Sequence, residues 1–489
     1  MANFNTFKSK LEFEEFFTKN KPESFIAIIG SGFASLSLVK NLNTKKIIVF
    51  EKGERFNDQS LRGLKIENLG NYQLKENSIE ESIGGSSNTW SGRLSEMNKG
   101  EFCSTNNICI NIFNELIKTF YKKSWRFFGF KNFKQIERGK NGYTERILPK
   151  QYSPMRISES LKRLNIKLIY KANVINVGED YYGTFMNVVF NDLFEKKIYF
   201  KKVVLANGGI NSSLLLKKSY QDGYLKPNKS ELISSHYMNH PKIIFERFFS
   251  NLPKKSPFFL KKKYDLNFYG YSLSKSIKEE SLLKNTYFTF HPIAIGENTI
   301  EYECADEIIR NKKKCFKILL DYIKENNFNF FSILKIFYFL GCKLRIFNIR
   351  IKNYDLEYFC EMLPNKRNKI YAHQNSIKSE INLSEDDFIT LEILHQKLVS
   401  EFPLNVRSKY KEINFRDKKF IDSSHHLGGI PLRDEQKKTV INADLKIVDS
   451  KNIYVCSSSV FQSSGSSNPT LTIVALGIRL AEHLNNLKK

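Results

Sequence analysis

The chain reads Phe25-Ile-Ala-Ile-Ile-Gly-Ser-Gly-Phe-Ala-Ser-Leu-Ser-Leu-Val-Lys-Asn-Leu42 and, shortly afterwards, Lys46-Ile-Ile-Val-Phe-Glu-Lys-Gly53. Each stretch contains a continuous apolar run, as expected for a strand that is buried on both faces of a parallel sheet. Between the two runs, apolar residues recur at the spacing of a helix. The pattern therefore predicts a βαβ unit of a Rossmann-like α/β fold.

The turn after the first predicted strand has the form G-x-G-x-x-S. Gly30 allows a tight turn, Gly32 lets the backbone approach a pyrophosphate at the helix N-terminus, and Ser35 replaces the third small residue. Glu51 ends the second predicted strand about 20 residues later, where a carboxylate accepts hydrogen bonds from a ribose 2′-OH. Because an acid at this position would repel a 2′-phosphate, we expect FAD or NAD and not NADP.

Three other segments combine an apolar run or an aromatic residue with small, flexible residues. Ile83-Gly-Gly-Ser-Ser-Asn-Thr-Trp-Ser-Gly-Arg93 is suited to lying against phosphates or a flavin ring. Val203 to Leu216 reads as a buried strand, a glycine turn and a helix start. Near the C-terminus, the strand-like run 452–461 and the segment Ser464-Gly-Ser-Ser-Asn-Pro-Thr-Leu-Thr-Ile473 place backbone N–H groups at the start of an apolar helix, which suits an anion or a flavin edge.

Taken in order, these segments resemble the glucose-methanol-choline (GMC) family of flavin oxidoreductases. The Gly30 turn with Glu51 resembles the family's FAD-binding βαβ unit, and 84–88 resembles its glycine loop beside the flavin. Lys171-Ala-Asn-Val174 is similar to the strand whose valine backbone touches adenine. Val203 to Leu216 is similar to the family's LA-x-GG-I element.

The resemblance continues into the second half of the chain. Asn239-His240-Pro241 is similar to the step that opens the substrate lobe, and Glu361-Met-Leu-Pro-Asn365 to the strand that closes it. The resemblance is weakest between about 240 and 360, where lobes of this kind vary most. It implies a Rossmann-like FAD lobe built from discontinuous segments and a substrate lobe with a mostly antiparallel sheet and helical insertions.

The expected domains are 22–235 for the FAD lobe, with part of the substrate lobe inserted near 95–160, then 236–415 for the substrate lobe, and 416–489 for the segment that completes the FAD lobe. The resemblance implies FAD as cofactor, and the absence of histidine from Ser87-Asn-Thr-Trp90 predicts that it is held without a covalent bond. The implied FAD-binding residues are Gly30, Gly32, Phe33, Ala34, Ser35, Glu51, Lys52, Gly84, Gly85, Ser86, Ser87, Asn88, Trp90, Val174, Ala206, Gly208, Ser457, Ser458, Pro469 and Thr470.

The resemblance also implies a catalytic pair, His425 and Asn468, with His426 and Glu361 as substrate residues. When a hydride passes from an alcohol carbon to flavin N5, the hydroxyl must lose its proton. A neutral imidazole takes this proton at cellular pH, and an amide orients the same hydroxyl. The segment departs from the family where Gly429 and Leu432 replace the usual Thr and Met. Ser457 also replaces the usual Asp or Gly.

We therefore expect an FAD-dependent oxidoreductase that oxidises a CH–OH group to a carbonyl. Similarity of the C-terminal element to the sugar- and polyol-oxidising branch suggests a carbohydrate, such as a phosphorylated sugar or a glycan precursor of polysaccharide biosynthesis. Two alternatives remain: a non-redox FAD protein of the lyase type, and a basic membrane- or nucleic-acid-binding protein with a vestigial flavin fold. The electron acceptor, and the choice between oxidase and dehydrogenase, stay open.

The composition is that of a globular protein, with 41% hydrophobic residues and a formal net charge of +26. This charge favours anionic partners, among them an acidic membrane surface. With no RNA- or DNA-reading motif in the sequence, nucleic acid is not expected. Cysteine spacing predicts reduced thiols and no metal site, and the N-terminus lacks an apolar signal region, so we expect a cytoplasmic protein, with the inner face of the membrane as an alternative location.

The segment 329–344 is the most apolar part of the chain, and Lys335 interrupts it while Lys343, Arg345, Arg350 and Lys352 follow. It is too short to span a bilayer. Aromatic residues flanked by cations resemble an interfacial membrane segment. A buried helix of the second lobe is the interpretation that we favour, because apolar runs of this length are more often core.

Overall fold

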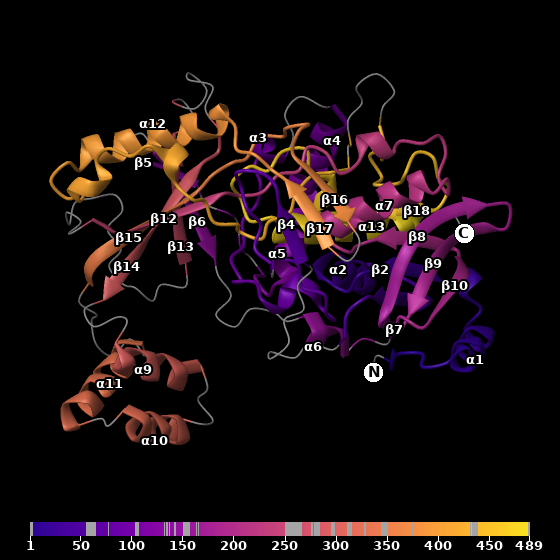
Figure 1. The fold of residues 1–489 in the computed structure, drawn as a ribbon, viewed down its shortest axis with the longest axis horizontal. Helices are drawn as coiled ribbons and strands as arrows, with labels where there is room; N and C mark the ends of the chain where they lie inside the picture. The colour runs from indigo at the N-terminus through magenta and orange to yellow at the C-terminus, as the bar shows by residue number, and fades with distance from the viewer. Residues whose placement is uncertain are drawn as a thin grey trace.

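Figure 1 shows the protein as a computed structural model. The structure describes residues 3–487 except 55–64, 77, 103–106, 132, 134, 136, 141–142, 150–156, 163, 165, 250–266, 275–276, 278–283, 295–298, 311–314, 327–328, 344–350, 374–375, 431 and 433–438. Arg345 and Arg350, which the sequence places beside the apolar segment, lie outside the described residues.

A parallel sheet is built from strands that are far apart in the sequence. Its strand order is β1-β7-β3-β2-β11-β18, and every neighbouring pair is parallel. The strands are β1 (Asn3–Asn5), β2 (Ile26–Ile29), β3 (Ile47–Glu51), β7 (Lys167–Tyr170), β11 (Lys202–Leu205) and β18 (Ile453–Val455). Strands β2 and β3 are buried along their whole length, in agreement with their continuous apolar sequences.

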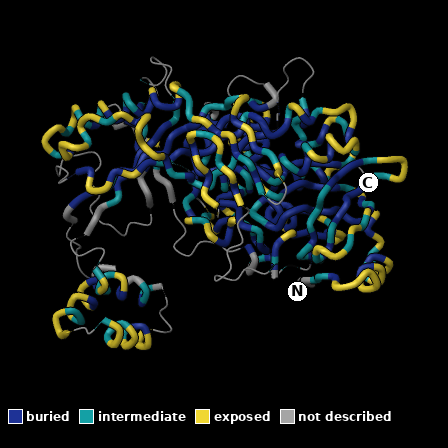
Figure 2. Tube along the Cα trace, in the orientation of Figure 1, coloured by how far each residue is buried: buried dark blue, intermediate teal, exposed yellow. Residues whose placement is uncertain are grey.

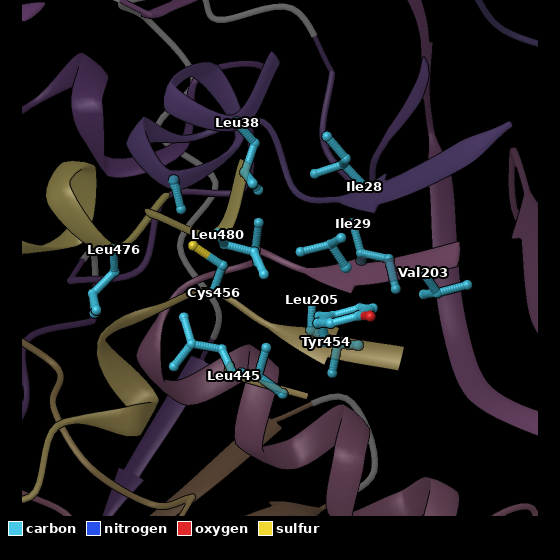
Figure 3. Close-up of a cluster of buried hydrophobic side chains, with 14 of the residues drawn as sticks. Ile28, Ile29, Leu38, Val203, Leu205, Leu445, Tyr454, Cys456, Leu476 and Leu480 are labelled. Atoms are coloured by element: carbon cyan, nitrogen blue, oxygen red, sulfur yellow. The ribbon is translucent and has the colours of Figure 1, made fainter. Parts of the chain in front are cut away.

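Helix α2 (Phe33–Asn41) follows β2 and packs against the C-terminal helix α13 (Thr470–Asn486). The two helices approach closely at Gly477, where an added Cβ would lie 1.9 Å from the Ser37 hydroxyl oxygen. Figure 3 shows the apolar core at this end of the sheet, with side chains from β2, α2, β11, β18 and α13. The labelled residues include Ile28, Leu38, Leu205, Cys456, Leu476 and Leu480.

A small antiparallel sheet lies beside the parallel one. It consists of β8 (Ala172–Asp180), β9 (Gly183–Phe190) and β10 (Phe194–Phe200), in the order β10-β9-β8. Helix α7 (Gly209–Gln221) packs on β8, and helix α1 (Lys10–Asn20) buries Phe13 and Phe17 near Phe190 of β9. These elements complete the half of the molecule labelled with the two termini in Figure 1.

The other half of the molecule contains an antiparallel sheet in the order β12-β15-β14-β13-β6-β5. Its strands are β5 (Glu137–Lys140), β6 (Tyr143–Pro149), β12 (Lys242–Phe249), β13 (Asn267–Leu273), β14 (Tyr287–Ala294) and β15 (Ile351–Phe359). Helix α12 (Glu385–Glu401) starts with a capping box between Ser384 and Asp387 and buries Leu391 and Leu394 in the same core as Tyr358 of β15. Strands β5 and β6 thus join later strands in this sheet.

A third sheet, in the order β16-β17-β4, pairs β4 (Lys65–Asn68) with β17 (Ser376–Glu380), and β16 (Lys369–His373) lies on the other side of β17. The remaining described elements are short: η1 (Pro22–Ser24), η2 (Gly85–Asn88), α3 (Lys99–Phe102), α4 (Asn107–Glu115), η3 (Leu116–Phe120), α5 (Tyr121–Phe127), α6 (Ile157–Lys162), η4 (Ser230–Leu232), η6 (Ser408–Tyr410), η7 (Phe415–Asp417) and η8 (Ser458–Val460).

A small helical lobe lies between β14 and β15 in the sequence and projects from the second half of the molecule (Figure 1). It consists of α9 (Ile300–Arg310), α10 (Cys315–Asn326) and α11 (Phe330–Lys343), which share a core of their own. Helix α11 covers the apolar segment for which the sequence favoured a buried helix. Only one face of α11 is buried, because the lobe is too small to enclose the whole helix, and the outer surface of the lobe is largely exposed in Figure 2.

The predicted fold class is confirmed: the structure is α/β, with a parallel Rossmann-like sheet and a separate antiparallel sheet that carries helical insertions. Among the described helices, none has the length and the apolar content needed to cross a membrane.

Candidate active site

The glycine turn after β2 is held by close contacts with its neighbours. Gly30 has φ +90°, and a Cβ at this position would lie 2.6 Å from Cα of Asn207, so a larger residue would displace the loop after β11. Its backbone N–H donates to the carbonyl of Phe50 over 2.7 Å. Gly32 caps α2 without a side chain of its own. The first amides of α2 therefore point toward the space in front of the sheet, as they do at anion sites.

Glu51 lies at the end of β3, as the sequence predicted, and is 8% exposed. Its Oε2 accepts hydrogen bonds from the hydroxyl of Ser31 (2.6 Å) and the backbone N–H of Ser31 (3.1 Å), and its Oε1 accepts one from the N–H of Gly53. Burial raises the pKa of the carboxyl to about 6, although these donors oppose the shift. The Ser31 hydroxyl also accepts the N–H of Gly84, so it joins the two glycine segments.

The Gly84–Asn88 loop is a compact turn with both glycines at positive φ, +99° and +51°. Asn88 is buried, and its side-chain NH₂ donates to the hydroxyl of Ser82 and the carbonyl of Ile83. Beyond the turn, the ring of Trp90 packs edge-to-face on Phe33 of α2, with 4.8 Å between ring centroids. Asn88 therefore shapes the loop from inside, while Trp90 fixes it against α2.

A cavity of about 960 Å³ lies between the glycine turns and the second half of the molecule. Most residues that the sequence assigned to the site line it, although they come from eight separate parts of the chain. These are Gly30, Gly32, Phe33, Ala34, Glu51, Lys52, Gly85, Ser86, Ser87, Trp90, Val174, Ala206, Gly208, His425, His426, Ser457, Ser458, Asn468, Pro469 and Thr470. Residues assigned to the site that do not line this cavity are Ser35, Gly84, Asn88 and Glu361.

The residues present fit a dinucleotide such as FAD. The volume is of the size that binds a large cofactor. At Gly208, with φ +84°, an added Cβ would meet no described atom within 4 Å, so the backbone borders open space at this point. The carbonyl Oδ1 of Asn468 is buried without a hydrogen-bond partner among the described residues. A bound group would use both features, since buried polar atoms usually have a partner.

His425 is partly buried in the cavity wall, and its two ring nitrogens have different partners. Nδ1 lies 2.8 Å from Nδ1 of His240, and Nε2 lies 3.4 Å from the side-chain nitrogen of Asn468. Nε2 of His240 lies 2.9 Å from the backbone carbonyl of Ser464. The residue before His425, Ser424, has φ +57°, and its N–H donates to Asp422.

These contacts assign the tautomers of both rings. A carbonyl only accepts, so Nε2 of His240 carries a proton, and Nδ1 of a neutral His240 is then the acceptor. Nδ1 of His425 therefore donates, and Nε2 of His425 is left unprotonated on the Asn468 side. Burial lowers the pKa of His240 to about 4, which keeps it neutral. Burial, followed by the neighbouring histidines, Lys242 and Arg93, lowers the pKa of His425 well below its usual value.

His426 lines the same cavity, but the protein engages both of its ring nitrogens. Nδ1 is 2.5 Å from the Tyr237 hydroxyl, and Nε2 is 3.1 Å from the backbone carbonyl of Ser78. Asn239 donates to the Tyr237 hydroxyl and accepts the N–H of His240. The 237–240 segment pairs with the chain beside the two histidines. It orients His426 through Tyr237 and His425 through His240.

Asn468 follows a serine-rich turn that is fixed by a buried carboxylate. Glu101 is fully buried, and its Oε1 accepts the N–H and hydroxyl of Ser466 and the hydroxyl of Ser467, all at 3.0–3.1 Å. Burial alone would raise the pKa of Glu101, but the adjacent Arg146 and backbone N–H groups outweigh it and hold the pKa at about 2. The charged Glu101 therefore positions the turn before Asn468.

The wall beside the histidines carries several charges. Glu357 of β15 accepts Lys242 (2.9 Å), His291 (2.7 Å) and Arg93 (3.5 Å). Burial would raise its pKa, but the hydrogen bond from His291 and the charges of Arg93 and Lys242 outweigh this effect, and the pKa is about 2. Lys242, Arg93 and Glu357 all line the cavity. This part of the wall therefore carries two cations and one anion.

The residues that lie off the cavity have structural contacts. Glu361 is buried, with Oε1 accepting the hydroxyl of Ser463 and Oε2 accepting the backbone and side-chain N–H groups of Asn285. Ser35 is fully buried in α2. Among the residues that the structure describes, no group of His, Cys, Asp and Glu is arranged to hold a metal ion.

The C-terminal part of the chain is similar to a known protein family. Residues 348–477, which include both His425 and Asn468, match the C-terminal family model of the GMC oxidoreductases. This stretch is similar to the C-terminal domain of that family. The resemblance seen in the sequence is thereby confirmed, while the sugar and polyol branch stays a prediction. The family match supports oxidoreduction in general terms.

Solved structures show the same fold along nearly the whole chain. Pyridoxine 4-oxidase from Mesorbium loti is 11% identical, with a TM-score of 0.57, and the likeness covers 96% of this chain and 100% of that chain. A new fungal aryl-alcohol oxidase is 10% identical, with a TM-score of 0.53, over 94% of this chain and 98% of that chain. No curated protein matches the chain.

Sequence reasoning missed three residues that organise this site. Ser31 joins the two glycine segments, His240 sets the tautomer of His425, and Glu101 fixes the turn before Asn468. The Asn239-His240-Pro241 motif was a signal for His240, although it was assigned to the opening of the substrate lobe. Nothing in the local sequence marks Ser31 or Glu101, because their partners lie far along the chain.

Proposed function

We propose that this protein binds FAD without a covalent bond and oxidises a CH–OH group of a small alcohol to a carbonyl. His425 takes the hydroxyl proton in this reaction. The observation that carries the proposal is the unprotonated Nε2 of His425, which lies beside the amide of Asn468 in the cavity that the Gly30 turn also lines.

The two side chains have complementary roles toward the alcohol. The substrate hydroxyl donates its proton to Nε2 of His425 and accepts a hydrogen bond from the side-chain NH₂ of Asn468. When bound, FAD supplies the acceptor for the hydride that leaves the carbon. The alcohol thus loses one hydride and one proton and becomes a carbonyl, and the proton stays on His425. Asn468 stabilises the negative charge that develops on the oxygen.

The chain offers a separate group of residues for each part of FAD. The Gly30 turn and the start of α2 suit the pyrophosphate, Glu51 the ribose and the backbone at Val174 the adenine. The 84–90 loop and Ser457 suit the flavin end. The 87–90 stretch contains no histidine, cysteine or tyrosine that could tether the flavin. We expect acid precipitation to release the yellow cofactor into the supernatant, and yellow precipitated protein would contradict the non-covalent part of the proposal.

For the substrate, we infer a sugar, a polyol or a glycan precursor that carries an anionic group. Lys242 and Arg93 line the cavity beside His425, where both also contact Glu357. A phosphate or carboxylate on the substrate would accept charge-assisted hydrogen bonds from these two cations. The net charge of +26 would also attract anionic substrates.

The proposal is tested by the visible spectrum of the purified, FAD-loaded protein during anaerobic addition of alcohols. Pairs of neutral and phosphorylated sugars are added at the same concentration. We expect bleaching of the flavin bands by at least one compound, and faster bleaching by its phosphorylated partner. Lys242→Gln should reduce this preference without abolishing bleaching, because Lys242 would hold the anionic group and not the reacting carbon.

Each outcome of the bleaching experiment tests a different part of the proposal. Bleaching without preference for phosphorylated compounds would leave alcohol oxidation in place and remove the anionic substrate. Bound flavin that no alcohol bleaches would favour a non-redox FAD protein. A colourless protein that cannot be reconstituted with FAD would exclude the whole proposal.

A further inference from the structure

Helix α11 exposes an apolar stripe that its own lobe does not cover. Phe330 and Phe331 are 70% and 72% exposed, and Leu334, Phe337 and Tyr338 are 48%, 55% and 38% exposed. The spacing i, i+1, i+4, i+7 and i+8 places these five side chains on one arc of about 120°. Soluble proteins rarely leave so many large aromatic side chains side by side in water.

The opposite face of α11 already forms the core of the lobe. Ile336 and Phe339 are almost fully buried and pack with Cys304 and Ala305 of α9. The exposed stripe is therefore a second apolar surface of α11, separate from the face that packs in the core of the lobe. Helix α10 exposes two more apolar side chains one turn apart, Phe316 (72%) and Leu320 (39%).

The charges in this part of the sequence indicate which surface would cover the stripe. From 326 to 354 the sequence contains Lys335, Lys343, Arg345, Arg350 and Lys352 and no acidic residue. Among these, Lys335 is exposed on the border of the stripe, where it also pairs with Glu301 of α9. An apolar aromatic face bordered by cations is complementary to the headgroup region of an anionic bilayer.

From the stripe and these charges, we propose that the α9–α11 lobe docks the protein peripherally on an anionic membrane surface, with α11 lying in the plane of the interface. Its 14 residues are too few to span the hydrocarbon layer. Phe330, Phe331, Leu334 and Phe337 insert between the headgroups, and Lys335 lies at the level of the lipid phosphates.

This arrangement would bring the active site close to the membrane. The lobe is inserted between β14 and β15, and Glu357 and Phe359 of β15 line the active-site cavity. The docking itself does not depend on the reaction proposed above.

The test is cosedimentation of the full-length protein with vesicles. Vesicles of phosphatidylcholine with about one third phosphatidylglycerol are compared with pure phosphatidylcholine, at low and at high salt. The wild type should bind the anionic vesicles, less at high salt, and Phe331→Ser/Phe337→Ser should lower its partition coefficient about 10-fold. The matched control is Tyr181→Ser/Tyr182→Ser, which removes two aromatic side chains that are 96% and 81% exposed in the β8–β9 turn and should leave binding unchanged.

A wild type that binds no vesicle at low salt would overturn the proposal, as would equal loss in the stripe variant and the control. A wild-type dimer in analytical ultracentrifugation that the stripe variant makes monomeric, without vesicle binding, would assign the stripe to a second copy of the chain. The single variant Phe330→Ser, with an expected loss of about threefold, keeps the test valid if the double variant does not fold.

Discussion

The two walls of the active-site cavity are built differently. The wall on the parallel sheet consists largely of backbone at Gly30, Gly85 and Gly208, where a side chain would be strained or in the way. The opposite wall consists of side chains, with His425 and Lys242 among them. The first wall suits close contact with a large cofactor, and the second suits proton transfer and the binding of charge.

The two walls depend on the rest of the molecule in different ways. A glycine turn works through its own φ angle and the two residues beside it, and a short sequence motif therefore describes it. His425 works through His240, about 185 residues earlier in the chain, and through Ser464 beyond that. The wall that carries His425 is therefore more sensitive to long-range contacts than the glycine wall.

The largest effect is expected from His425→Ala. Loss of the base should slow anaerobic flavin reduction by about 10³-fold, within the range of general base catalysis. FAD should stay bound, because the variant leaves the glycine wall intact. The rate is measured by stopped-flow absorbance with the best alcohol from the substrate panel. His373→Ala, at an exposed histidine that is not part of the cavity lining, is the control and should react at the wild-type rate.

A smaller but informative effect is expected at His240, which acts through His425. His240→Leu removes the acceptor for Nδ1–H of His425, so kcat should fall about 10- to 100-fold, as is common for residues that orient a reactive side chain. His240→Gln keeps an acceptor and a donor and should recover part of this loss. Equal rates for the two variants would mean that His240 only fills space. Flavin absorbance and KM are followed in parallel and should change little.

On the glycine wall, Gly208→Ala should weaken FAD binding about 10-fold, because the new methyl group enters the space that the cofactor needs. Gly223→Ala is the matched control, since Gly223 also has positive φ, φ +77°, and open space at its Cβ, but lies outside the cavity lining. Both variants should lose about 1–3 kcal/mol of folding free energy from backbone strain. FAD titration followed by fluorescence separates the two, and an equal loss of affinity would argue against FAD at Gly208.

The last effect is a pH dependence of folding stability, and it arises at His240, behind the wall that carries His425. His240 has a pKa of about 4 in the folded state and near 6.5 unfolded, so the unfolded chain binds more protons between these values. Stability should therefore be full above pH 6.5 and decrease as the pH falls toward 4, by up to about 1.4 kcal/mol per pH unit for this residue. Glu101 and Glu357 act in a lower window, from about 4.5 to about 2.

Urea unfolding between pH 4 and 7 checks this dependence. His240→Gln should flatten the slope in that interval, whereas His373→Ala should not. A variant slope equal to that of the wild type would contradict the burial of a neutral His240.

Much of the first wall could be predicted from the sequence. The βαβ unit, the turn at Gly30, the acid at the end of β3 and the loop at 84–88 are local patterns whose geometry follows from a few adjacent residues. The positions of His425 and Asn468 came from family resemblance, and the structure brings the two within 3.4 Å of each other. The helix at 330–343 was recognised as apolar, but the extent of its burial depended on the size of its lobe.

The sequence by itself therefore determined the α/β class and the nucleotide-binding turns, because glycine conformation and apolar periodicity act over short stretches of chain. The candidate pair came from the resemblance of the sequence to the GMC family. Only the tertiary structure decided the tautomer of His425, the role of Glu101 and the exposed face of α11. Each of these depends on which distant groups lie within hydrogen-bonding or packing distance, and this is fixed only when the two sheets and the lobe are assembled.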